Sequence, residues 1–299
     1  MTAKSLPLWR SLLFVPVTNP RFVEKSAQTG ADAVILDLED SIPDAEKPRA
    51  RALLAAAVPR AAAGGAAIVV RVNRPWRSLI ADLEAAVIAG IAALMLPKVE
   101  SAEQVEAIAE IVTEWEEERG LPPGQIGLIP MIETARGLFR AEAIARSDAR
   151  IVALTLGAED FALSLGMEPE AEGLFYPKQQ MIIAARAAGI MPLGFLGSVA
   201  DFTDLGAFRA TLRRSRRLGF VGASAIHPAQ IAVINEEYAP SAAEIDRAER
   251  LLAAYDAGVA LGKGAVAFEG KMIDAPVVAR ARQTLLRAAA IAARKAEKK

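Results

Sequence analysis

Short apolar runs recur along this chain, and Ala-rich stretches with helical patterning separate one run from the next. Eight such runs are rich in Val, Ile and Leu: residues 11–16, 33–38, 67–72, 93–97, 126–131, 151–156, 190–196 and 220–226. A run that is apolar at nearly every position indicates a strand covered on both faces. Regular alternation of such strands with helices indicates parallel pairing through helical crossovers.

The residues between the runs agree with this alternation. "SAEQ" at 101–104 and "SAAE" at 241–244 have the pattern of capping boxes, which start helices. Eight strand–helix units without a G-x-G-x-x-G or Walker motif favour a closed barrel over a doubly wound sheet. We therefore predict an α/β protein, a (β/α)8 TIM barrel with a C-terminal helical extension. Glycines suited to the positive φ of a helix C-cap stand just before four runs, at Gly30, Gly90, Gly189 and Gly219.

The pattern changes after the eighth run. Residues 241–264 and 276–294 have helical patterning, whereas "GKGAVAFEGKMID" at 262–274 is typical of a loop. We predict that residues 1–235 form a catalytic barrel domain and that residues 236–299 form an added extension, not a ninth unit.

The composition excludes several kinds of chemistry. Hydrophobic residues make up 53% and charged residues 24%, with 35 Lys+Arg against 36 Asp+Glu, so no overall charge favours nucleic acid or a membrane. The absence of cysteine removes disulfides, thiolate metal sites and a Cys nucleophile. Because no signal peptide or membrane span is evident, we expect a cytoplasmic protein. The only histidine, His227, is interpreted as structural, which leaves acid–base work mainly to carboxylates, Lys or Tyr.

Polar residues stand at the C-terminal ends of six of the predicted strands. In a barrel those ends share one rim, where the active sites of this fold are built. A single acid at a strand–helix junction is often an N-cap or an ion-pair partner. Ionisable groups at six strand ends are hard to explain as caps, so we predict a functional site at this rim. The groups are Asp37, Glu39, Asp40, Arg71, Asn73, Lys98, Glu133, Glu159, Asp160 and His227.

Such a rim suggests metal-assisted chemistry. Mg²⁺ prefers oxygen and is usually held by one or two carboxylates together with waters and substrate oxygens. Glu133 and Asp160, at the ends of adjacent predicted strands, fit that requirement, with Mn²⁺ as the alternative ion. Arg71 is placed to bind a substrate carboxylate or a developing enolate oxygen. Glu159 is interpreted as a structural partner.

Eight stretches, in order, resemble one known family. They extend from residue 10 to about residue 283 and are "RSLLFVPV", "AVILDLEDSI", "VRVN", "LMLPKVES", "IPMIETARGL", "LGAEDF", "GFVGASAIHPAQI" and "GKMIDAPVVARA". The chain resembles the citrate lyase β-subunit-like (CitE-like) proteins. This group includes malyl-CoA and citramalyl-CoA lyases and lies within the HpcH/HpaI aldolase and citrate lyase superfamily.

The resemblance implies a Mg²⁺-dependent carbon–carbon lyase that cleaves or forms a β-hydroxyacyl-CoA such as citramalyl-CoA, malyl-CoA or citryl-CoA. Cleavage gives an α-oxo acid and acetyl-CoA. Carried over by position, Glu133 and Asp160 ligate the metal, and Arg71 contacts the oxo acid and the thioester enolate. Glu39 and Asp40 surround the metal waters as further catalytic candidates.

The resemblance also implies an assembly. Asp274 in "KMID" matches an acid that family members insert from a neighbouring subunit as the general acid or base. The extension is therefore expected to pack on a neighbouring subunit of a homotrimer or hexamer. Without the resemblance, Asp274 ahead of Pro276 is equally well interpreted as a helix N-cap. Arg21 and Lys25 lie where CoA-contacting residues fall in the family, and Lys98 is a third candidate for cofactor binding.

Three positions depart from the family's pattern and leave the acyl group open. Val17 stands where the first strand usually ends in glycine, Lys178 where an arginine is frequent, and Gly194 where an aspartate is frequent. A second interpretation is a CoA-independent aldolase acting on hydroxy-keto acids, although aldolases of that kind in the superfamily have a histidine where this chain has Asp40. A third reading is a lyase β subunit that needs an acyl carrier protein, or a binding protein without catalysis.

Overall fold

The structure is a computed structural model that describes residues 6–198, 204–262 and 266–297. The chain divides into two compact units, Met1–Asn235 and Glu236–Lys299. Each unit has a hydrophobic cluster of its own.

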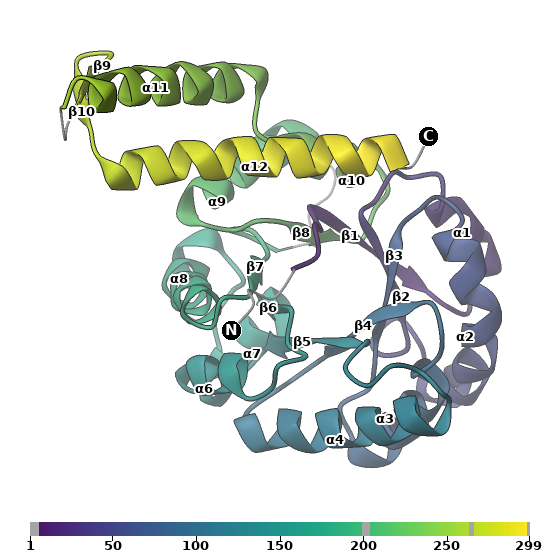
Figure 1. The fold of residues 1–299 in the computed structure, drawn as a ribbon. Helices are drawn as coiled ribbons and strands as arrows, with labels where there is room; N and C mark the ends of the chain where they lie inside the picture. Colours follow the sequence, from purple (N-terminus) through teal and green to yellow (C-terminus); the bar gives the residue numbers. More distant parts are fainter. Residues whose placement is uncertain (1–5, 199–203, 263–265, 298–299) are drawn as a thin grey trace. The chain divides into compact units, whose positions relative to one another are not determined.

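Eight parallel strands form a ring in the first unit (Figure 1). Consecutive strands pair from β1 to β7, and β1 also pairs with β8. Between β7 and β8 the amide of Gly194 donates to the carbonyl of Gly222 (2.8 Å), beside a bridge from Leu193 to Gly222. The predicted TIM barrel is thus confirmed. The strands are β1 (Ser11–Pro16), β2 (Ala33–Asp37), β3 (Ala67–Arg71), β4 (Ile91–Leu96), β5 (Gly127–Ile132), β6 (Ala153–Leu156), β7 (Met191–Leu193) and β8 (Ala223–Ala225).

Helices surround this ring on the outside (Figure 1). The helix start predicted at 101–104 is present, with Ser101 Oγ accepting the amide of Gln104 (3.3 Å). The predicted capping box is incomplete, because the Gln104 side chain accepts the amide of Glu100 instead of that of Ser101. The helices are α1 (Pro20–Ser26), η1 (Asp44–Glu46), α2 (Lys47–Ala62), α3 (Trp76–Ala86), α4 (Ala102–Glu118), α5 (Ala135–Phe139), α6 (Ala141–Arg146), α7 (Ala158–Leu165), α8 (Ala171–Ala187), α9 (Leu205–Leu218) and α10 (Ala229–Glu237).

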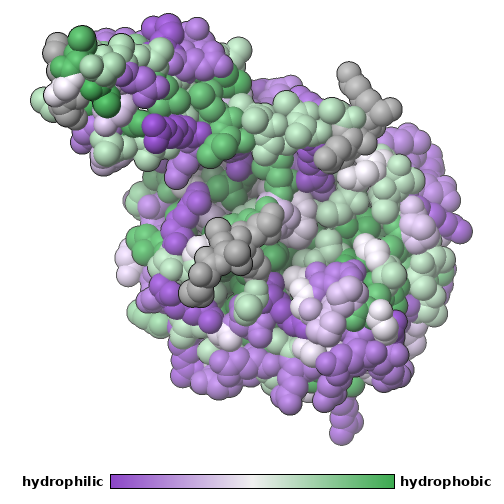
Figure 2. All heavy atoms as spheres, viewed as in Figure 1, coloured by the Kyte–Doolittle hydropathy of each residue, from purple (hydrophilic) through white to green (hydrophobic). Residues whose placement is uncertain are grey.

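The outer helices are amphipathic. In α4 the buried positions include Val105, Ile108 and Val112, which recur at helical spacing, and glutamates occupy much of the opposite face. Hydrophilic side chains accordingly gather over α3 and α4 at the lower edge of Figure 2. Among the described residues, no helix has both the length and the apolar character needed to cross a membrane.

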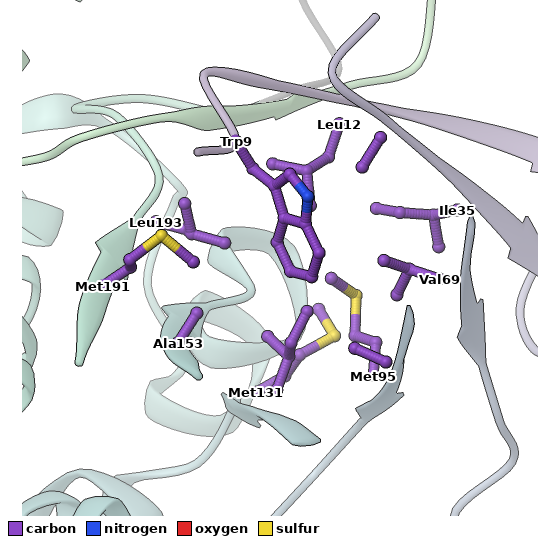
Figure 3. Packing of buried hydrophobic residues seen from close by; sticks show 12 residues of the cluster. Trp9, Leu12, Ile35, Val69, Met95, Met131, Ala153, Met191 and Leu193 are labelled. Carbon is purple, nitrogen blue, oxygen red and sulfur yellow. The ribbon is translucent and has the colours of Figure 1, made fainter. Parts of the chain in front are cut away.

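The inside of the barrel is filled by apolar side chains from alternate strand positions. Residues two apart on a strand point to the same face, as Ala33 and Ile35 do in this cluster. Trp9, which precedes β1 and is 4% exposed, places its indole among them, towards Met95 and Met131 (Figure 3). The segment before β1 therefore closes the barrel at the amino ends of the strands.

The same alternation continues to the carboxyl ends of the strands, where polar groups replace apolar ones. Asp37, Arg71 and Glu133 each lie two residues beyond a side chain of the apolar cluster on the same strand or its extension, namely Ile35, Val69 and Met131. Because positions two apart share a face, these polar side chains form a layer above the apolar core.

The amino ends of the strands carry two buried ion pairs. Arg10 donates from Nε and Nη2 to the two carboxylate oxygens of Asp32 (2.8 and 3.0 Å). Arg150 Nη2 donates to Glu116 Oε2 (2.6 Å), and the amide of Ile126 donates to Glu116 Oε1 (2.8 Å). The four charged side chains are buried, and each acid has its own cation.

The second unit contains two long helices and a hairpin. The helix α11 (Ala242–Ala260) begins with the predicted capping box, in which Ser241 and Glu244 exchange side chain–backbone hydrogen bonds. The strands β9 (Val266–Phe268) and β10 (Lys271–Ile273) pair antiparallel, so the expected irregular loop over 262–274 is wrong for these residues. The helix α12 (Ala275–Glu297) follows, and Ile273 and Val278 belong to the apolar cluster of this unit.

Candidate active site

The carboxyl ends of the barrel strands surround a cavity of ≈ 460 Å³. This volume is usual for a small-molecule site. Its lining includes Asp40, Arg71, Glu133 and Asp160, together with the segment that follows β7. A polar hollow beside it is lined in part by Glu39, Asp40 and Lys98. The predicted rim is thus the wall of a cavity.

Arg71 is held in one orientation by Asp37. The strands β2 and β3 pair in a register that places Asp37 directly opposite Arg71. The guanidinium donates from Nε to Oδ1 (2.7 Å) and from Nη2 to Oδ2 (2.8 Å) of Asp37, a two-bond geometry that fixes its plane. Burial alone would raise the pKa of Asp37, but the hydrogen bonds and charge of Arg71 hold that pKa below its usual value.

The third guanidinium nitrogen of Arg71 faces two further acids. Nη1 donates to Asp40 Oδ2 (2.9 Å) and lies 3.0 Å from Glu39 Oε2 in ion-pair contact. The ring of Phe14 lies against the guanidinium, with its centroid 4.8 Å from Cζ. Burial opposes the charge on Arg71, but the nearby acids, Asp37 above all, raise its pKa. Arg71 is therefore a permanent cation with a fixed direction.

Glu133 is buried just beyond the end of β5 and is held by backbone groups. The amide of Lys98 donates to Glu133 Oε2 (2.7 Å). Gly157, which follows β6, leaves room for the other carboxylate oxygen, because a Cβ at this position would stand 2.3 Å from Glu133 Oε1. A side chain at 157 would thus displace the Glu133 carboxylate, so glycine suits this close approach.

The negative charge of the carboxylates at the rim is not fully balanced by nearby cations. Burial raises the pKa of Glu133 to about 7, and repulsion from Asp160 adds to the shift. Burial likewise raises the pKa of Glu39 to about 8, with repulsion from Asp40 and Glu133. Glu39 Oε2 is buried and accepts no hydrogen bond from the described residues. A further cation at this rim would favour the ionised form of both glutamates.

Lys98 connects the two predicted metal ligands. Its amide bonds to Glu133, and its ammonium lies 3.4 Å from Glu39 Oε1 and 3.5 Å from Asp160 Oδ1. The backbone of Lys98 adopts a φ of 52°, in the left-handed region that a residue with a side chain seldom occupies. Strain of this kind is concentrated at functional sites. Here it directs both the amide and the ammonium of one residue towards the acids.

The residues at the rim fit a divalent cation. Among the described residues, five carboxylates, including Glu133 and Asp160, contact the two residues Arg71 and Lys98. No three His, Asp or Glu side chains within the described ranges lie close enough to enclose a metal by themselves. A hard ion held by two carboxylates, and completed by water and substrate oxygens, matches both observations.

The structure brings six of the predicted site residues together at the rim. Arg21 and Lys25 are exposed on α1, and neither lines the cavity, the polar hollow beside it, or a second hollow lined in part by Lys98, Glu133 and Asp160. Asp274 is exposed in the second unit, where Oδ1 accepts the amide of Val277 (3.3 Å) and caps α12. CoA contact by Arg21 and Lys25 and catalysis by Asp274 stay predictions. The residues that converge are Glu39, Asp40, Arg71, Lys98, Glu133 and Asp160.

Two other strand-end residues make local contacts. Glu159 accepts a hydrogen bond from the Ser198 hydroxyl, as expected of a structural partner, but it also lines the cavity. His227 Nδ1 accepts the amide of Ala229 (3.2 Å) at the start of α10, which agrees with a structural role.

Several residues of the site have no assigned role in the sequence analysis. Asp37 follows from strand parity, since it shares a face with Ile35, but its pairing with Arg71 depends on register. Gly157 gives no signal, because its need arises from a side chain on another strand. Lys178 does give one: it interrupts the apolar stripe of α8, whose buried positions include Leu174, Pro177, Met181, Ile182 and Ala185.

The profile of the HpcH/HpaI aldolase/citrate lyase family matches residues 10–228, which include the whole barrel. The chain belongs to this family. By class it is therefore an enzyme of the carbon–carbon lyase type.

Individual relatives are similar over nearly the full length. The chain is 37% identical over 284 residues to citrate lyase subunit beta of Escherichia coli (strain K12), covering 93% of each chain. It is 35% identical over 288 residues to the L-malyl-CoA/beta-methylmalyl-CoA lyase of Cereibacter sphaeroides (strain ATCC 17029 / ATH 2.4.9), covering 89% of this chain and 90% of that one. A crystal structure of CitE from Mycobacterium tuberculosis, in complex with magnesium, acetoacetate and coenzyme A, superposes with a TM-score of 0.76. It is 34% identical, with 93% of this chain and 97% of that one covered. The family predicted from the motifs is confirmed.

Proposed function

We propose that this protein is a Mg²⁺-dependent lyase that cleaves or forms the carbon–carbon bond of a β-hydroxyacyl-CoA, with an α-oxo acid and acetyl-CoA as the other partners. The proposal depends on one observation: Glu133 and Asp160 both contact Lys98, beside the fixed cation Arg71. Mn²⁺ is the alternative ion. The relative from Mycobacterium tuberculosis, whose structure holds magnesium and coenzyme A, supports the proposal. We expect the enzyme in the cytoplasm.

Glu133 and Asp160 are the side chains that would hold the metal. A bound divalent ion acts as a Lewis acid on the oxygen of the oxo acid. Gly157 and the Lys98 amide keep the Glu133 carboxylate in place, so this ligand is oriented before substrate arrives. Glu39 and Asp40, which line the neighbouring hollow, would accept hydrogen bonds from waters around the ion.

Arg71 stabilises the charge that develops on the thioester. In the cleavage direction the β-hydroxyl loses its proton to a rim carboxylate, and its carbon becomes the carbonyl carbon of the oxo acid. The adjacent carbon–carbon bond breaks, and its electron pair remains on the thioester as an enolate. A fixed cation beside the enolate oxygen lowers this barrier, and loss of one such donor usually costs about 10²- to 10³-fold in rate. Because two hydrogen bonds to Asp37 hold the guanidinium, Arg71 does not need to reorient when the enolate forms.

Asp274 is proposed to complete the reaction. Its carboxylic acid gives a proton to the enolate carbon, which becomes the methyl group of acetyl-CoA, and the carboxylate removes that proton in the reverse direction. Asp274 is exposed in its own chain, so it is available to the site of a neighbouring subunit in a homotrimer or hexamer. Arg21 and Lys25 remain the candidates for contact with CoA.

A second candidate function is that of a lyase β subunit. The similarity to citrate lyase subunit beta of Escherichia coli favours it, because that relative is named as a subunit. In this case the acyl group would be carried by a protein partner. Both candidates use the same rim residues and differ in the carrier of the acyl group.

An assay of the purified chain separates the candidates. We expect the chain alone, with Mg²⁺, to cleave at least one of malyl-CoA, citramalyl-CoA and citryl-CoA, with loss of turnover in EDTA and recovery on adding Mg²⁺. Turnover only after addition of an acyl carrier protein would support the subunit function. Cleavage of a CoA-free hydroxy-keto acid would support an aldolase instead.

Complementation between variants tests the role of Asp274. Asp160→Ala and Asp274→Asn should each be inactive, because one lacks a metal ligand and the other lacks the proton donor. If Asp274 acts in a neighbouring site, mixed oligomers contain some sites with both intact residues and regain part of the activity. The measurement is the rate after mixing and reassembly of the two variants. Absence of recovery, with assembly verified by scattering, would assign Asp274 to the site of its own chain.

A further inference from the structure

A buried lysine in the cavity wall has no part in the chemistry described above. Lys178 lies on α8, is 3% exposed, and lines the same cavity as Glu133 and Asp160. A lysine is rarely buried to this extent without a partner for its charge. Its surroundings therefore indicate what the cavity is built to bind.

Two of the three N–H groups of the Lys178 ammonium are occupied by backbone. Nζ donates to the carbonyl oxygens of Phe195 and Gly197, each at 2.6 Å. The Phe195 ring lies close, with its centroid 5.6 Å from Nζ. Within the described part of the chain, Lys178 makes no other hydrogen bond and no ion pair with a carboxylate. With respect to residues 6–198, 204–262 and 266–297, one N–H therefore remains for a ligand in the cavity.

The backbone that holds the ammonium has an unusual conformation. Gly194 and Gly197, on either side of Phe195, have φ values of 140° and 135°, which side chains rarely permit. A Cβ on Gly194 would also stand 2.9 Å from the ring of Phe220. This turn aims two carbonyls at Lys178 and so fixes the position of its charge.

The charge of Lys178 is poorly compensated. Burial lowers the pKa of Lys178 to about 7, and only Glu159 opposes this shift. Glu159 is exposed and bonds to Ser198, so it is a weak counter-charge. The buried arginines of the barrel, by contrast, each contact a buried carboxylate. An isolated buried cation costs free energy that an anionic ligand removes.

Lys178 and the predicted metal ligands line the same cavity, so one ligand can meet both. Asp160 follows β6, and the turn held by Lys178 follows β7, the strand paired with β6. A dicarboxylate in this cavity can therefore direct one carboxylate towards each of them.

We propose that Lys178 is a specificity-determining residue that binds the second carboxylate of an α-oxo dicarboxylic acid. The first carboxylate and the oxo group of that acid face Glu133 and Asp160. The inference rests on the proposed function, since it assigns the class of oxo acid that the lyase releases or consumes. An acid with no second carboxylate would leave the N–H of Lys178 without a partner in the cavity wall.

Two ligands that differ only in one carboxylate test this assignment. Oxaloacetate is pyruvate with a carboxylate on its methyl carbon, and each is titrated calorimetrically into the full-length protein with Mg²⁺. We expect the wild type to bind oxaloacetate about 10- to 100-fold more tightly than pyruvate, the usual value of a charged hydrogen bond. Lys178→Met, which keeps the length but has no N–H, should bring this ratio close to one. Lys178→Arg should retain most of the preference.

The ratio within each variant separates specificity from a structural role, because a distorted cavity would weaken both ligands alike. Lys295→Met, at an exposed lysine of α12, is the matched control and should keep the wild-type ratio. Equal binding of both acids by the wild type, or an unchanged ratio in Lys178→Met, would overturn the assignment while thioester cleavage still supported the lyase. Absence of binding by either acid, together with no thioester cleavage, would overturn the proposed function as well.

Discussion

The two ends of the barrel both carry buried charges, but they balance them differently. At the amino ends of the strands, Arg10 pairs with Asp32 and Arg150 with Glu116, one cation for each acid. At the carboxyl ends, five carboxylates surround Arg71 and Lys98. The same residue types therefore form balanced, stabilising ion pairs at the amino ends of the strands. At the carboxyl ends they leave an excess of negative charge.

The pKa values express this difference. Hydrogen bonds from Arg150 and from backbone amides overcome burial and lower the pKa of Glu116. Glu133 is equally hidden from solvent, but its pKa is raised to about 7. Burial alone thus does not distinguish a structural acid from a functional one. The presence or absence of a matching cation within the protein does.

The largest expected effect comes from neutralising an acid at the carboxyl end. Glu133→Gln should lower Mg²⁺-dependent kcat/KM by at least about 10³-fold, because a metal ligand is lost while the shape is kept. The free energy of unfolding without Mg²⁺ should stay equal or rise, since an uncompensated buried charge is removed. Thioester cleavage rates and urea unfolding measure the two quantities. Glu110→Gln, at an exposed glutamate of α4, is the control. A marked loss of stability in Glu133→Gln would place this acid with the structural ones.

The opposite result is expected at the amino end. Glu116→Ala leaves Arg150 buried without its partner, which should lower the free energy of unfolding by about 3–5 kcal/mol. The kcat/KM of the folded fraction should stay near that of the wild type. Urea unfolding of this variant is compared with that of Glu118→Ala, an exposed site on the same helix. If Glu116→Ala loses activity without losing stability, the acids at the amino ends of the strands are not purely structural, and the difference between the two ends is contradicted.

A smaller effect should follow from a substitution at an uncharged residue of the site. Gly157→Ala introduces a methyl group 2.3 Å from Glu133 Oε1, so the carboxylate must move. We expect Mg²⁺ affinity to fall about 10- to 100-fold, as for other changes that disturb the orientation of a metal ligand. Calorimetric titration with Mg²⁺ measures it. Gly173→Ala is the control, because its Cβ would meet the flexible Met167 side chain at 3.3 Å and lie in ordinary contact with the Glu168 carbonyl oxygen at 4.0 Å. Unchanged affinity would mean that Glu133 has room to adjust.

The strand pattern was sufficient to predict the barrel and the rim. Period-two alternation places Arg71 and Glu133 above Val69 and Met131, and parallel strands bring their carboxyl ends together. Asp160 is found by its place in the short polar segment that follows a buried strand, four residues after Leu156. These inferences need only the order and length of the apolar runs, which can be taken directly from the amino-acid sequence.

Contacts between neighbouring strands were not accessible from the sequence. The pairing of Asp37 with Arg71 depends on register, and the need for Gly157 depends on how closely Glu133 approaches. The left-handed backbone of Lys98 is set by bonds to other strands, since lysine itself does not favour it. In the second unit, pairing across a turn made a hairpin of residues that lack a strong strand pattern.

Met131 belongs both to the wall of the cavity and to the hydrophobic core of the barrel. Its side chain is 7% exposed, lines the cavity, and belongs to the cluster around Trp9. The depth available to a substrate is therefore a matter of interior packing as much as of loop sequence. A substitution at Met131 can change the size of substrate that the cavity accepts while the acids and Arg71 remain in place. The same coupling restrains that route, since each volume change at 131 must be accommodated by neighbours in a close-packed interior.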